Sequence, residues 1–393
     1  MENQAVFEKT EYLARIRKVH HRMADLDIDT LLVVDPANMN YLSGYDGWSF
    51  YAHQGLLVRL DEDVPYWFGR EQDRSGALLT TWLPEDHLFT YPEYYVQSFS
   101  DHTMRFVASV LASNHWDKGR LGVELDGYWY SARSHIELQQ RLPGTTLVDA
   151  DRLVNWARTY KSEKELELMR EAASICTHVM ETAFSVIKDG VHERSAAAAV
   201  AAAQIEGIDG IGGDSPAIFP IMPAGPRTVA GHLTYDPQRA YRNGDIVMLE
   251  LSGCRKRYHM PLYRTMCIGK PSANLISMAA IMDDAFGALL DCIMPGSVAE
   301  MIERQWRAIM APHHVLAPAR VGYAFGLNYV PDWGEHTVNL RPGEKTVLAE
   351  HMTIHLIASL RIGSDVFETS EPVLVTGNGC TRFMDVPRAL HCS

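Results

Sequence analysis

The sequence predicts an α+β protein of two domains, a small α/β N-terminal domain over residues 1–155 and a larger C-terminal domain over residues 156–393. Three observations support this prediction. Helical and strand patterns alternate along the first part of the chain, a well-capped helix begins near residue 162, and two apolar segments flank a short turn at residues 252–257. The 393 residues suffice for two cores of ordinary size.

The N-terminal domain is predicted from its alternating elements. Apolar residues at three- and four-residue steps indicate an amphipathic helix over residues 9–27, and the strand Thr30–Val34 follows it. The alternation continues with strands at Gly55–Leu60, Tyr66–Phe68 and Leu121–Glu124 and with helices near residues 102–113 and 130–141. This order favours a small sheet covered by helices.

The C-terminal domain begins with a long helix. Ser162 and Glu165 have the spacing of a capping box, and Gly190 marks the end of the helical pattern. Residues 186–203 and 292–309 share an order of helix end, Ile, Gly, Val, Glu and next helix, which indicates two related halves, although an echo of this length also arises by chance. The two apolar segments, Ile246–Leu251 and Tyr258–Cys267, are predicted to be paired strands.

Composition excludes several classes of partner. The net charge of −13 argues against nucleic acid or an anionic membrane as the main partner. No apolar run reaches the roughly 18 residues of a membrane helix, and the N-terminus lacks the apolar core of a signal peptide, so we expect a cytoplasmic protein. The six cysteines include no CxxC pair, which predicts reduced, buried thiols and no zinc knuckle.

Glu250 is the only charged residue of an otherwise apolar strand. A buried carboxylate costs several kcal/mol unless it meets a cation, a metal or hydrogen-bond donors, so Glu250 belongs either to an ion pair or to a functional site. His232 ends the Pro- and Gly-broken segment 216–232, where a histidine is either a loop residue or part of a site. In the first domain, Trp48 and Tyr51 lie in a Gly-punctuated aromatic loop, which suits a pocket lining or a plug at a domain interface.

Residues 244–265, GDIVMLELSGCRKRYHMPLYRT, resemble the metal-bearing hairpin of the creatinase, prolidase and aminopeptidase P family, whose members read GDxVxxDxG…GYxSDxTRTF. Gly244 and Asp245 open the match, and Arg264 and Thr265 close it. The resemblance implies a pita-bread domain, which is a curved antiparallel sheet covered by helices with pseudo-twofold symmetry. It also implies that His232, thirteen residues before Asp245, is the catalytic histidine of the family.

The peptidases of this family bind two metal ions through five side chains, usually Asp, Asp, His, Glu and Glu. In this sequence those positions fall on or near Glu250, Pro261, Tyr323, Ile357 and Ser370. Only one of them is a carboxylate, and a two-metal site needs several oxygen or imidazole ligands. The resemblance therefore implies the metal-free branch of the family, with no metal and no other cofactor.

In that branch, an acid grips the N–H groups of a cationic substrate and a histidine activates water. The resemblance implies a hydrolase of small molecules that opens the cyclic amidinium ring of ectoine, and also of hydroxyectoine, to give N-acetyl-2,4-diaminobutyrate. Glu250 and His232 would be catalytic. The substrate-binding residues would be Tyr323, His259, Trp48, Tyr51, Glu335, His336 and Glu371.

Two other functions remain open at this point: a creatinase-like hydrolase of a guanidinium group, and an inactive pita-bread binding module. The resemblance also implies a homodimer in which the partner's N-terminal domain completes the pocket. The residue that binds the substrate carboxylate is left open among Arg70, Arg227, Arg264 and Arg361.

Overall fold

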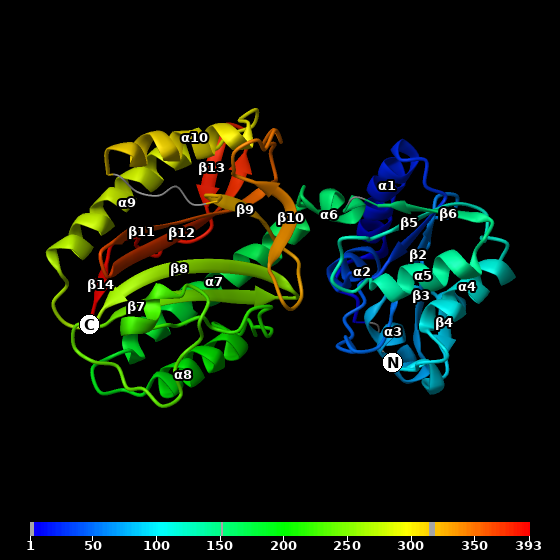
Figure 1. Ribbon diagram of the computed structural model, residues 1–393, viewed down its shortest axis with the longest axis horizontal. Coiled ribbons are helices and arrows are strands. Elements are labelled where there is room, and N and C mark those ends of the chain that lie inside the picture. The colour runs from blue at the N-terminus through cyan, green and yellow to red at the C-terminus, as the bar shows by residue number, and fades with distance from the viewer. Residues whose placement is uncertain (1–3, 151, 314–318) are drawn as a thin grey trace. The chain divides into compact units, whose positions relative to one another are not determined.

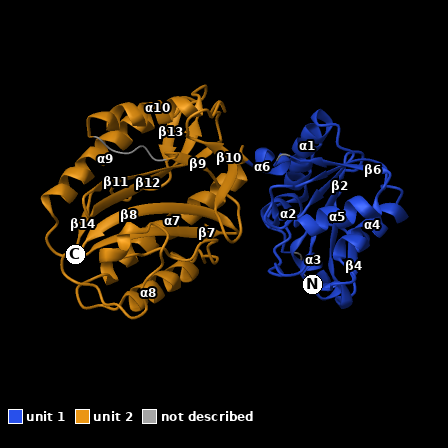
Figure 2. Cartoon of the chain, in the orientation of Figure 1, with its two compact units in different colours: residues 1–158 blue, residues 159–393 orange. Residues whose placement is uncertain are grey.

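The computed structural model describes residues 4–150, 152–313 and 319–393. The chain divides into two compact units, residues 1–158 and 159–393 (Figure 2). This division lies near the domain boundary predicted between residues 155 and 156. Each unit is described by itself below.

Unit 1 is an α/β domain around a six-stranded mixed sheet in the order β4-β3-β2-β1-β5-β6 (Figure 1). Strand β1 is antiparallel to β2 and parallel to β5, while the pairs β3–β4 and β5–β6 are parallel. The strands are β1 (Thr30–Val33), β2 (Gly55–Arg59), β3 (Tyr66–Arg70), β4 (Leu88–Tyr91), β5 (Gly119–Val123) and β6 (Thr145–Asp149). The helices are α1 (Lys9–Asp25), α2 (Pro36–Ser43), α3 (Arg74–Thr80), α4 (Thr103–Ser113), α5 (Ala132–Arg141) and α6 (Leu153–Arg158).

The elements of unit 1 follow from the apolar pattern of the sequence. Helix α1 buries Ile16, Val19 and Met23 at three- and four-residue steps, as its periodicity predicts. At the carboxyl ends of β1 and β5, the buried Glu124 accepts hydrogen bonds from the backbone N–H groups of Val34 (2.7 Å) and Asp35 (2.8 Å). These bonds fix the end of β1 beside β5.

Unit 2 is a pita-bread domain with antiparallel hairpins in two sheets, ordered β10-β9-β11-β12-β13 and β14-β8-β7. Its strands are β7 (Ile246–Arg255), β8 (Tyr258–Cys267), β9 (Gly322–Phe325), β10 (Gly334–Asn339), β11 (Thr353–Ile362), β12 (Asp365–Thr376), β13 (Gly379–Arg382) and β14 (His391–Cys392). Its helices are α7 (Glu163–Val186), α8 (Glu193–Glu206), α9 (Ala273–Cys292) and α10 (Ala299–Met310).

Strands β8 and β12 join the two sheets through side chains. The Ser370 hydroxyl accepts a hydrogen bond from the backbone N–H of Tyr263 (2.7 Å). The Thr265 hydroxyl donates to the backbone oxygen of Glu368 (2.8 Å) and accepts from its N–H (2.9 Å). These bonds replace a backbone ladder, so the two hairpins form one curved layer.

Each half of unit 2 consists of two helices and one long hairpin. Helices α7 and α8 lie against β7 and β8, while α9 and α10 lie on the side of β11, β12 and β13 (Figure 1). The predicted capping box is present at the start of α7, with Glu165 N–H bonded to Ser162 Oγ and Ser162 N–H bonded to the Glu165 carboxylate. The fold is the small α/β domain and pita-bread domain that the sequence predicted.

Two further expectations from the sequence concern the cysteines and the length of the apolar helices. Cys176, Cys254 and Cys267 are buried and, like the other three cysteines, form no disulfide. Among the helices of the described residues, none combines the length and the apolar character needed to cross a membrane.

Candidate active site

The candidate site lies on the inner face of the curved sheet, defined here as the face that carries Glu250, Tyr263 and Ile357. Glu250 and Tyr263 are direct cross-strand partners on β7 and β8, so their side chains project to the same side. Ile357 of β11 packs against the buried cluster of Met248, Tyr263 and Val366, which brings the second hairpin to the same face. Of the predicted catalytic residues, this face carries Glu250.

Glu250 is a buried carboxyl group with only 6% of its surface exposed. Burial raises its pKa to about 8, and the negative charges of Glu368 and then Asp332 contribute to the increase. Within the described residues, no cation forms an ion pair with Glu250. This absence favours a functional role for Glu250 over a structural ion pair.

Glu368 is a second, partly buried acid that the sequence analysis did not identify. Burial raises its pKa to about 7, an effect that the nearby Tyr263 hydroxyl partly offsets. The Tyr263 hydroxyl is buried beside Glu368, and burial, Glu368 and Glu250 together raise its pKa well above the usual value. Glu368 lies two residues before Ser370 on β12, so strand alternation was the signal that could have found it.

Tyr323 of β9 lies close enough to Glu250 for the carboxylate to raise its pKa, second only to the effect of burial. Its hydroxyl accepts a hydrogen bond from the Trp333 indole N–H (2.9 Å) and is 3.0 Å from Nδ1 of His355. His355, on β11, is fully buried, and burial lowers its pKa to about 3, which keeps the imidazole neutral. Trp333 and His355 were not among the predicted site residues.

His259 of β8 is a neutral, buried histidine. Burial lowers its pKa to about 4, and Nε2 accepts a hydrogen bond from the backbone N–H of Ala217 (2.8 Å). Because Nε2 accepts, the proton of the neutral ring is on Nδ1, which is buried without a partner. The ring centre lies 6.4 Å from that of Trp333, so His259 is a neighbour of the Tyr323 group.

Two of the predicted substrate-binding residues already have partners. Glu335 is fully buried and its carboxylate accepts hydrogen bonds from Lys161 Nζ at 2.7 and 2.8 Å. His336 Nε2 lies 2.7 Å from Asp332 Oδ2, within hydrogen-bond distance. Glu335 is thus a structural ion-pair member, which corrects the prediction, whereas His336 is tied to the acid that acts on Glu250.

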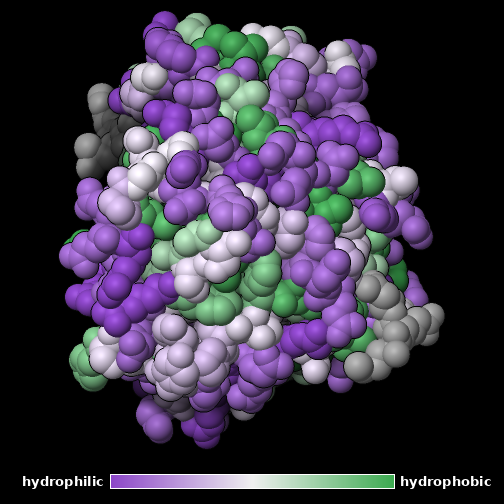
Figure 3. Space-filling model, turned by 90° about the vertical axis from the view of Figure 1, so that its right-hand side faces the viewer, coloured by the Kyte–Doolittle hydropathy of each residue, from purple (hydrophilic) through white to green (hydrophobic). Residues whose placement is uncertain are grey.

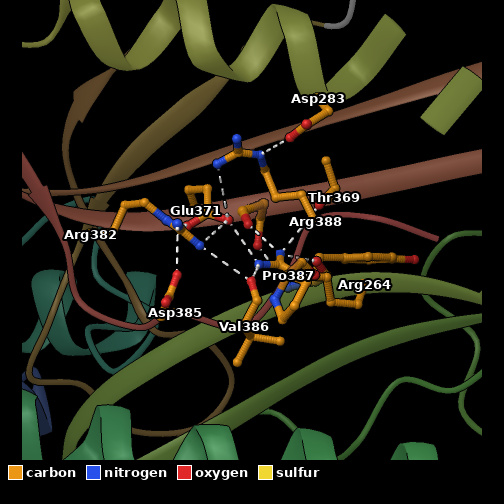
Figure 4. A network of polar contacts seen from close by, with 11 residues as sticks. Arg264, Asp283, Thr369, Glu371, Arg382, Asp385, Val386, Pro387 and Arg388 are labelled. Atoms are coloured by element: carbon orange, nitrogen blue, oxygen red, sulfur yellow. Dashed lines mark hydrogen bonds and ion pairs between the residues drawn. The ribbon is translucent and has the colours of Figure 1, made fainter. Parts of the chain in front are cut away.

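Glu371 is also structural, contrary to the prediction. It follows Ser370 directly, so strand alternation places its side chain on the face opposite to Glu368. There it pairs with Arg264 (2.8 Å), Arg382 (2.8 Å) and Arg388 (3.7 Å) in the buried network of Figure 4. Arg264 donates further hydrogen bonds to backbone oxygens of Ser370, Val386 and Pro387.

His232 lies after the short turn Gly225–Val229, and its side chain is exposed. No hydrogen bond or ion pair joins it to Glu250 in the part of the chain that the structure describes. The structure therefore does not bring the two predicted catalytic residues into contact. The reason is that a Pro- and Gly-broken loop, and not the sheet, carries the histidine.

Of the four arginines considered for the substrate carboxylate, Arg361 fits the inner face best. Strand alternation places it on the same side of β11 as Ile357, and it is bonded to the backbone oxygen of Val229 at 3.4 Å, in the turn before His232. Arg264 is used by Glu371, and Arg70 of unit 1 is paired with Asp73 at 2.7 Å. Arg227 donates to the backbone oxygen of Thr234.

Trp48 and Tyr51 lie in unit 1 and are 52% and 59% exposed. The Tyr51 ring lies under the Arg70 guanidinium, 4.9 Å from its centre. Next to this loop, a cavity of about 280 Å³ is lined by Val34, Pro36, Phe50, Tyr51, Ala52, His53, Gln54, Tyr128, Trp129 and Ser131. The loop is therefore not a buried plug within unit 1.

The chain matches two family models, the creatinase/prolidase N-terminal domain over residues 15–160 and metallopeptidase family M24 over residues 167–378. It is 37% identical over 391 residues to the ectoine hydrolase of Halomonas elongata, with 98% of each chain covered. It is 39% identical over 384 residues to the uncharacterized hydrolase/peptidase y4tM of Sinorhizobium fredii, again with 98% of each covered. The creatinase of a Bacillus species is 24% identical over 397 residues, which cover 97% of this chain and 92% of that one.

Solved structures share the fold at low sequence identity. The prolidase from Pyrococcus horikoshii superposes with a TM-score of 0.79 at 21% identity, covering 96% of this chain and 99% of that chain. The prolidase from Thermococcus sibiricus gives a TM-score of 0.83 at 16% identity, covering 98% and 100%.

Fold and site together define a two-domain hydrolase of the creatinase and prolidase class. The chain belongs to metallopeptidase family M24, with the creatinase/prolidase N-terminal domain ahead of its pita-bread domain.

The donor set at the family's metal positions does not fit a metal ion. Pro261 and Ile357 have no side-chain ligand, the Tyr323 hydroxyl is bonded to Trp333 and His355, and the Ser370 hydroxyl is bonded to the backbone of β8. Across residues 4–150, 152–313 and 319–393, no group of three or more His, Cys, Asp or Glu side chains is arranged to hold a metal. Glu250 is thus the one strong ligand among the five positions.

Proposed function

We propose that this hydrolase opens the cyclic amidinium ring of ectoine, or of hydroxyectoine, at a C–N bond to give N-acetyl-2,4-diaminobutyrate. The observation that carries the proposal is a pair of acids, the buried Glu250 and the partly buried Glu368, for which the described residues show no ion pair with a side-chain cation. Two carboxyl groups with raised pKa in one site favour a ligand that brings positive charge and N–H donors. The similarity to an ectoine hydrolase over the whole chain supports the same substrate class.

An amidinium cation suits this pair better than a neutral peptide does. Its charge is spread over two nitrogens, and each nitrogen can donate a hydrogen bond to a carboxylate oxygen. Its central carbon is already electron-poor, so water can attack it once the charge is held in place. We assign the substrate carboxylate to Arg361, which lies on the inner face without an acidic partner in the described residues.

Glu250 has two possible roles in the reaction. It either holds the amidinium by charge-assisted hydrogen bonds while water attacks the carbon, or attacks that carbon itself to form an adduct that water releases. We retain His232 as the base that activates this water, because of its place in the family pattern. The His232→Ala variant tests that assignment, because removing the base should lower turnover.

The experiment incubates the protein, stripped of metal, with ectoine, hydroxyectoine and creatine, and follows each compound by NMR. We expect loss of ectoine or hydroxyectoine and appearance of an N-acetylated diamino acid. Turnover of creatine instead would establish a guanidinium hydrolase, and no turnover of any compound would favour a binding module.

Variants test the assigned residues. Glu250→Gln should lower turnover by roughly 10²-fold or more, as expected for a catalytic acid or base, and Glu368→Gln should weaken substrate binding. Glu181→Gln, on the exposed side of α7, is the matched control and should leave both unchanged. If Glu250→Gln kept more than about a tenth of the wild-type turnover, the loss would be too small for a catalytic acid or base. The assignment of Glu250 to the active site would then be wrong.

We further propose a homodimer in which the partner's Trp48 loop completes the pocket. Trp48 and Tyr51 are large, mostly exposed side chains. Figure 3 shows one face of the molecule, where hydrophobic residues are interspersed among mainly hydrophilic ones. Mixing Glu250→Gln protein with Trp48→Ala protein tests this. Mixed dimers should regain activity, because one of their two sites then combines wild-type Glu250 from one protomer with wild-type Trp48 from its partner. If activity did not rise after verified subunit exchange, the shared pocket would be ruled out.

A further inference from the structure

The Tyr323 hydroxyl oxygen lies within hydrogen-bond distance of two neighbours, Trp333 and His355. A phenol oxygen has one proton and two lone pairs. The Trp333 indole N–H can only donate, so its 2.9 Å contact fills one lone pair of the oxygen. The second contact, 3.0 Å to His355 Nδ1, depends on which ring nitrogen of His355 is protonated.

The surroundings of His355 favour the proton on Nδ1. Its Nε2 is buried and has no hydrogen-bond partner. A buried N–H without an acceptor is costly, whereas a lone pair tolerates this position better, above all where positive charge is near. Arg320 and Arg264 supply that charge, since both lower the pKa of His355 after the larger effect of burial. His355 therefore donates to Tyr323, and the phenol proton is left for another acceptor.

Tyr323 is the cross-strand partner of His355, and strand alternation places His355 on the same face of β11 as Ile357, so Tyr323 belongs to the inner face that carries Glu250. Its carboxylate is the charge that most raises the pKa of Tyr323 after burial, with a smaller contribution from Asp332. With Trp333 and His355 both donating to the oxygen, neither contact uses the Tyr323 proton. A substrate held at Glu250 would meet this proton.

We propose that Tyr323 is the catalytic acid that protonates the departing ring nitrogen, with Trp333 and His355 as positioning residues that direct its proton into the site. This inference rests on the proposed ring-opening hydrolysis. It moves Tyr323 from substrate binding to proton transfer and leaves water activation to His232.

The surroundings also stabilise the phenolate that remains after proton transfer. The Arg320 guanidinium lies over the Tyr323 ring, 4.2 Å from its centre, and the Trp333 hydrogen bond and the Arg320 charge both oppose the increase in pKa caused by burial. The phenolate oxygen would thus accept two N–H hydrogen bonds and lie near one cation, Arg320. This is the arrangement expected of a group that gives up a proton in a transition state.

The step is balanced in either role of Glu250. The ring C–N bond breaks, its electron pair stays on nitrogen, and the Tyr323 proton forms the new N–H bond. The attacking water supplies the oxygen that becomes the amide carbonyl. One of its two protons returns the phenolate to the phenol, and the other is released as the carbonyl forms and completes the ammonium group of the departing amine. No other reactant is required.

The kinetic test compares wild type, Tyr323→Phe and the matched control Tyr241→Phe on ectoine. Tyr241 is a buried tyrosine with an unpartnered hydroxyl outside the site. Tyr323→Phe should lower kcat by about 10² or more with little change in KM, whereas Tyr241→Phe should match wild type. Trp333→Phe should lower kcat less and also leave KM nearly unchanged, because the acid remains but its proton is no longer directed.

Two outcomes separate this inference from the proposed function. If wild type hydrolyses ectoine and Tyr323→Phe keeps more than about a tenth of kcat, the acid role is wrong while the hydrolase assignment stands. If wild type acts on neither ectoine nor hydroxyectoine, both are wrong.

A structural measurement needs no turnover. NMR of protein labelled with ¹⁵N in histidine should show His355 as a neutral ring protonated on Nδ1, with a shifted signal in Tyr323→Phe and no change in Tyr241→Phe. A ring protonated on Nε2 in wild type would overturn the proposal, because Tyr323 would then donate to His355 and have no proton for the substrate.

Discussion

The carboxyl groups of Glu250 and Glu368 lie on the same inner face, and the charge of Glu368 is the largest cause, after burial, of the raised pKa of Glu250. One acid comes from β7 and the other from β12, more than a hundred residues apart in the sequence. Such a pair keeps at least one proton near neutral pH until a cation arrives.

Stability should fall as pH rises, because both acids have a higher pKa in the folded protein than the usual value of 4.5. Between about pH 5 and pH 7, the unfolded chain has lost these protons and the native protein retains them. Each acid therefore lowers the free energy of unfolding by up to about 1.4 kcal/mol per pH unit.

Denaturant unfolding at pH 5 and pH 7 measures this effect. The double variant Glu250→Gln/Glu368→Gln should show a flatter pH dependence than wild type and should be the more stable protein at pH 7. Identical slopes in the two proteins would contradict the raised pKa values.

Binding of an amidinium should release a proton. Glu250 pairs with the cation only as a carboxylate, and with a pKa of about 8 it is mostly protonated at pH 7 in the free protein. Calorimetry with acetamidinium in two buffers of different ionisation enthalpy should give roughly one proton released per ligand at pH 7 and little at pH 9. Glu250→Gln should abolish most of the release; buffer-independent heats in wild type would refute the linkage.

Glu371→Gln should lower the free energy of unfolding and leave catalysis unchanged. Removing its charge leaves Arg264 buried without its carboxylate, which typically costs about 3–5 kcal/mol. Glu368→Gln, three positions earlier on the same strand, is the matched comparison and should have the opposite effect, with stability kept and substrate binding weakened. Unfolding curves and KM at a temperature where both variants are folded check this contrast.

Chelators should not inhibit the protein. The five family metal positions supply one strong ligand, Glu250, and the hydroxyls of Tyr323 and Ser370 are already hydrogen-bonded. Turnover should persist after dialysis against EDTA, with less than stoichiometric metal in the sample by elemental analysis. Activity lost to EDTA and restored by manganese or zinc would show this expectation to be wrong.

The sequence by itself determined the α/β and pita-bread folds, the strands β7 and β8 and the capped start of α7, and it singled out Glu250 as an acid in an apolar strand. These features depend on local signals: apolar periodicity, the capping box and a lone acid in an apolar strand are all visible within a few residues. The unusual donor set was visible for the same reason, because proline and isoleucine have no ligand in any fold.

Tertiary structure decided which polar residues share the site. Glu371 and Glu368 are both acids of one strand, and only the register of β11 and β12 shows that Glu371 faces the arginines while Glu368 faces Glu250. Glu335 was equally ambiguous until Lys161, from a distant segment, was found against it. Tyr323, Trp333 and His355 form one group only because β9, its following loop and β11 meet, and contacts between distant segments leave no local pattern in the sequence.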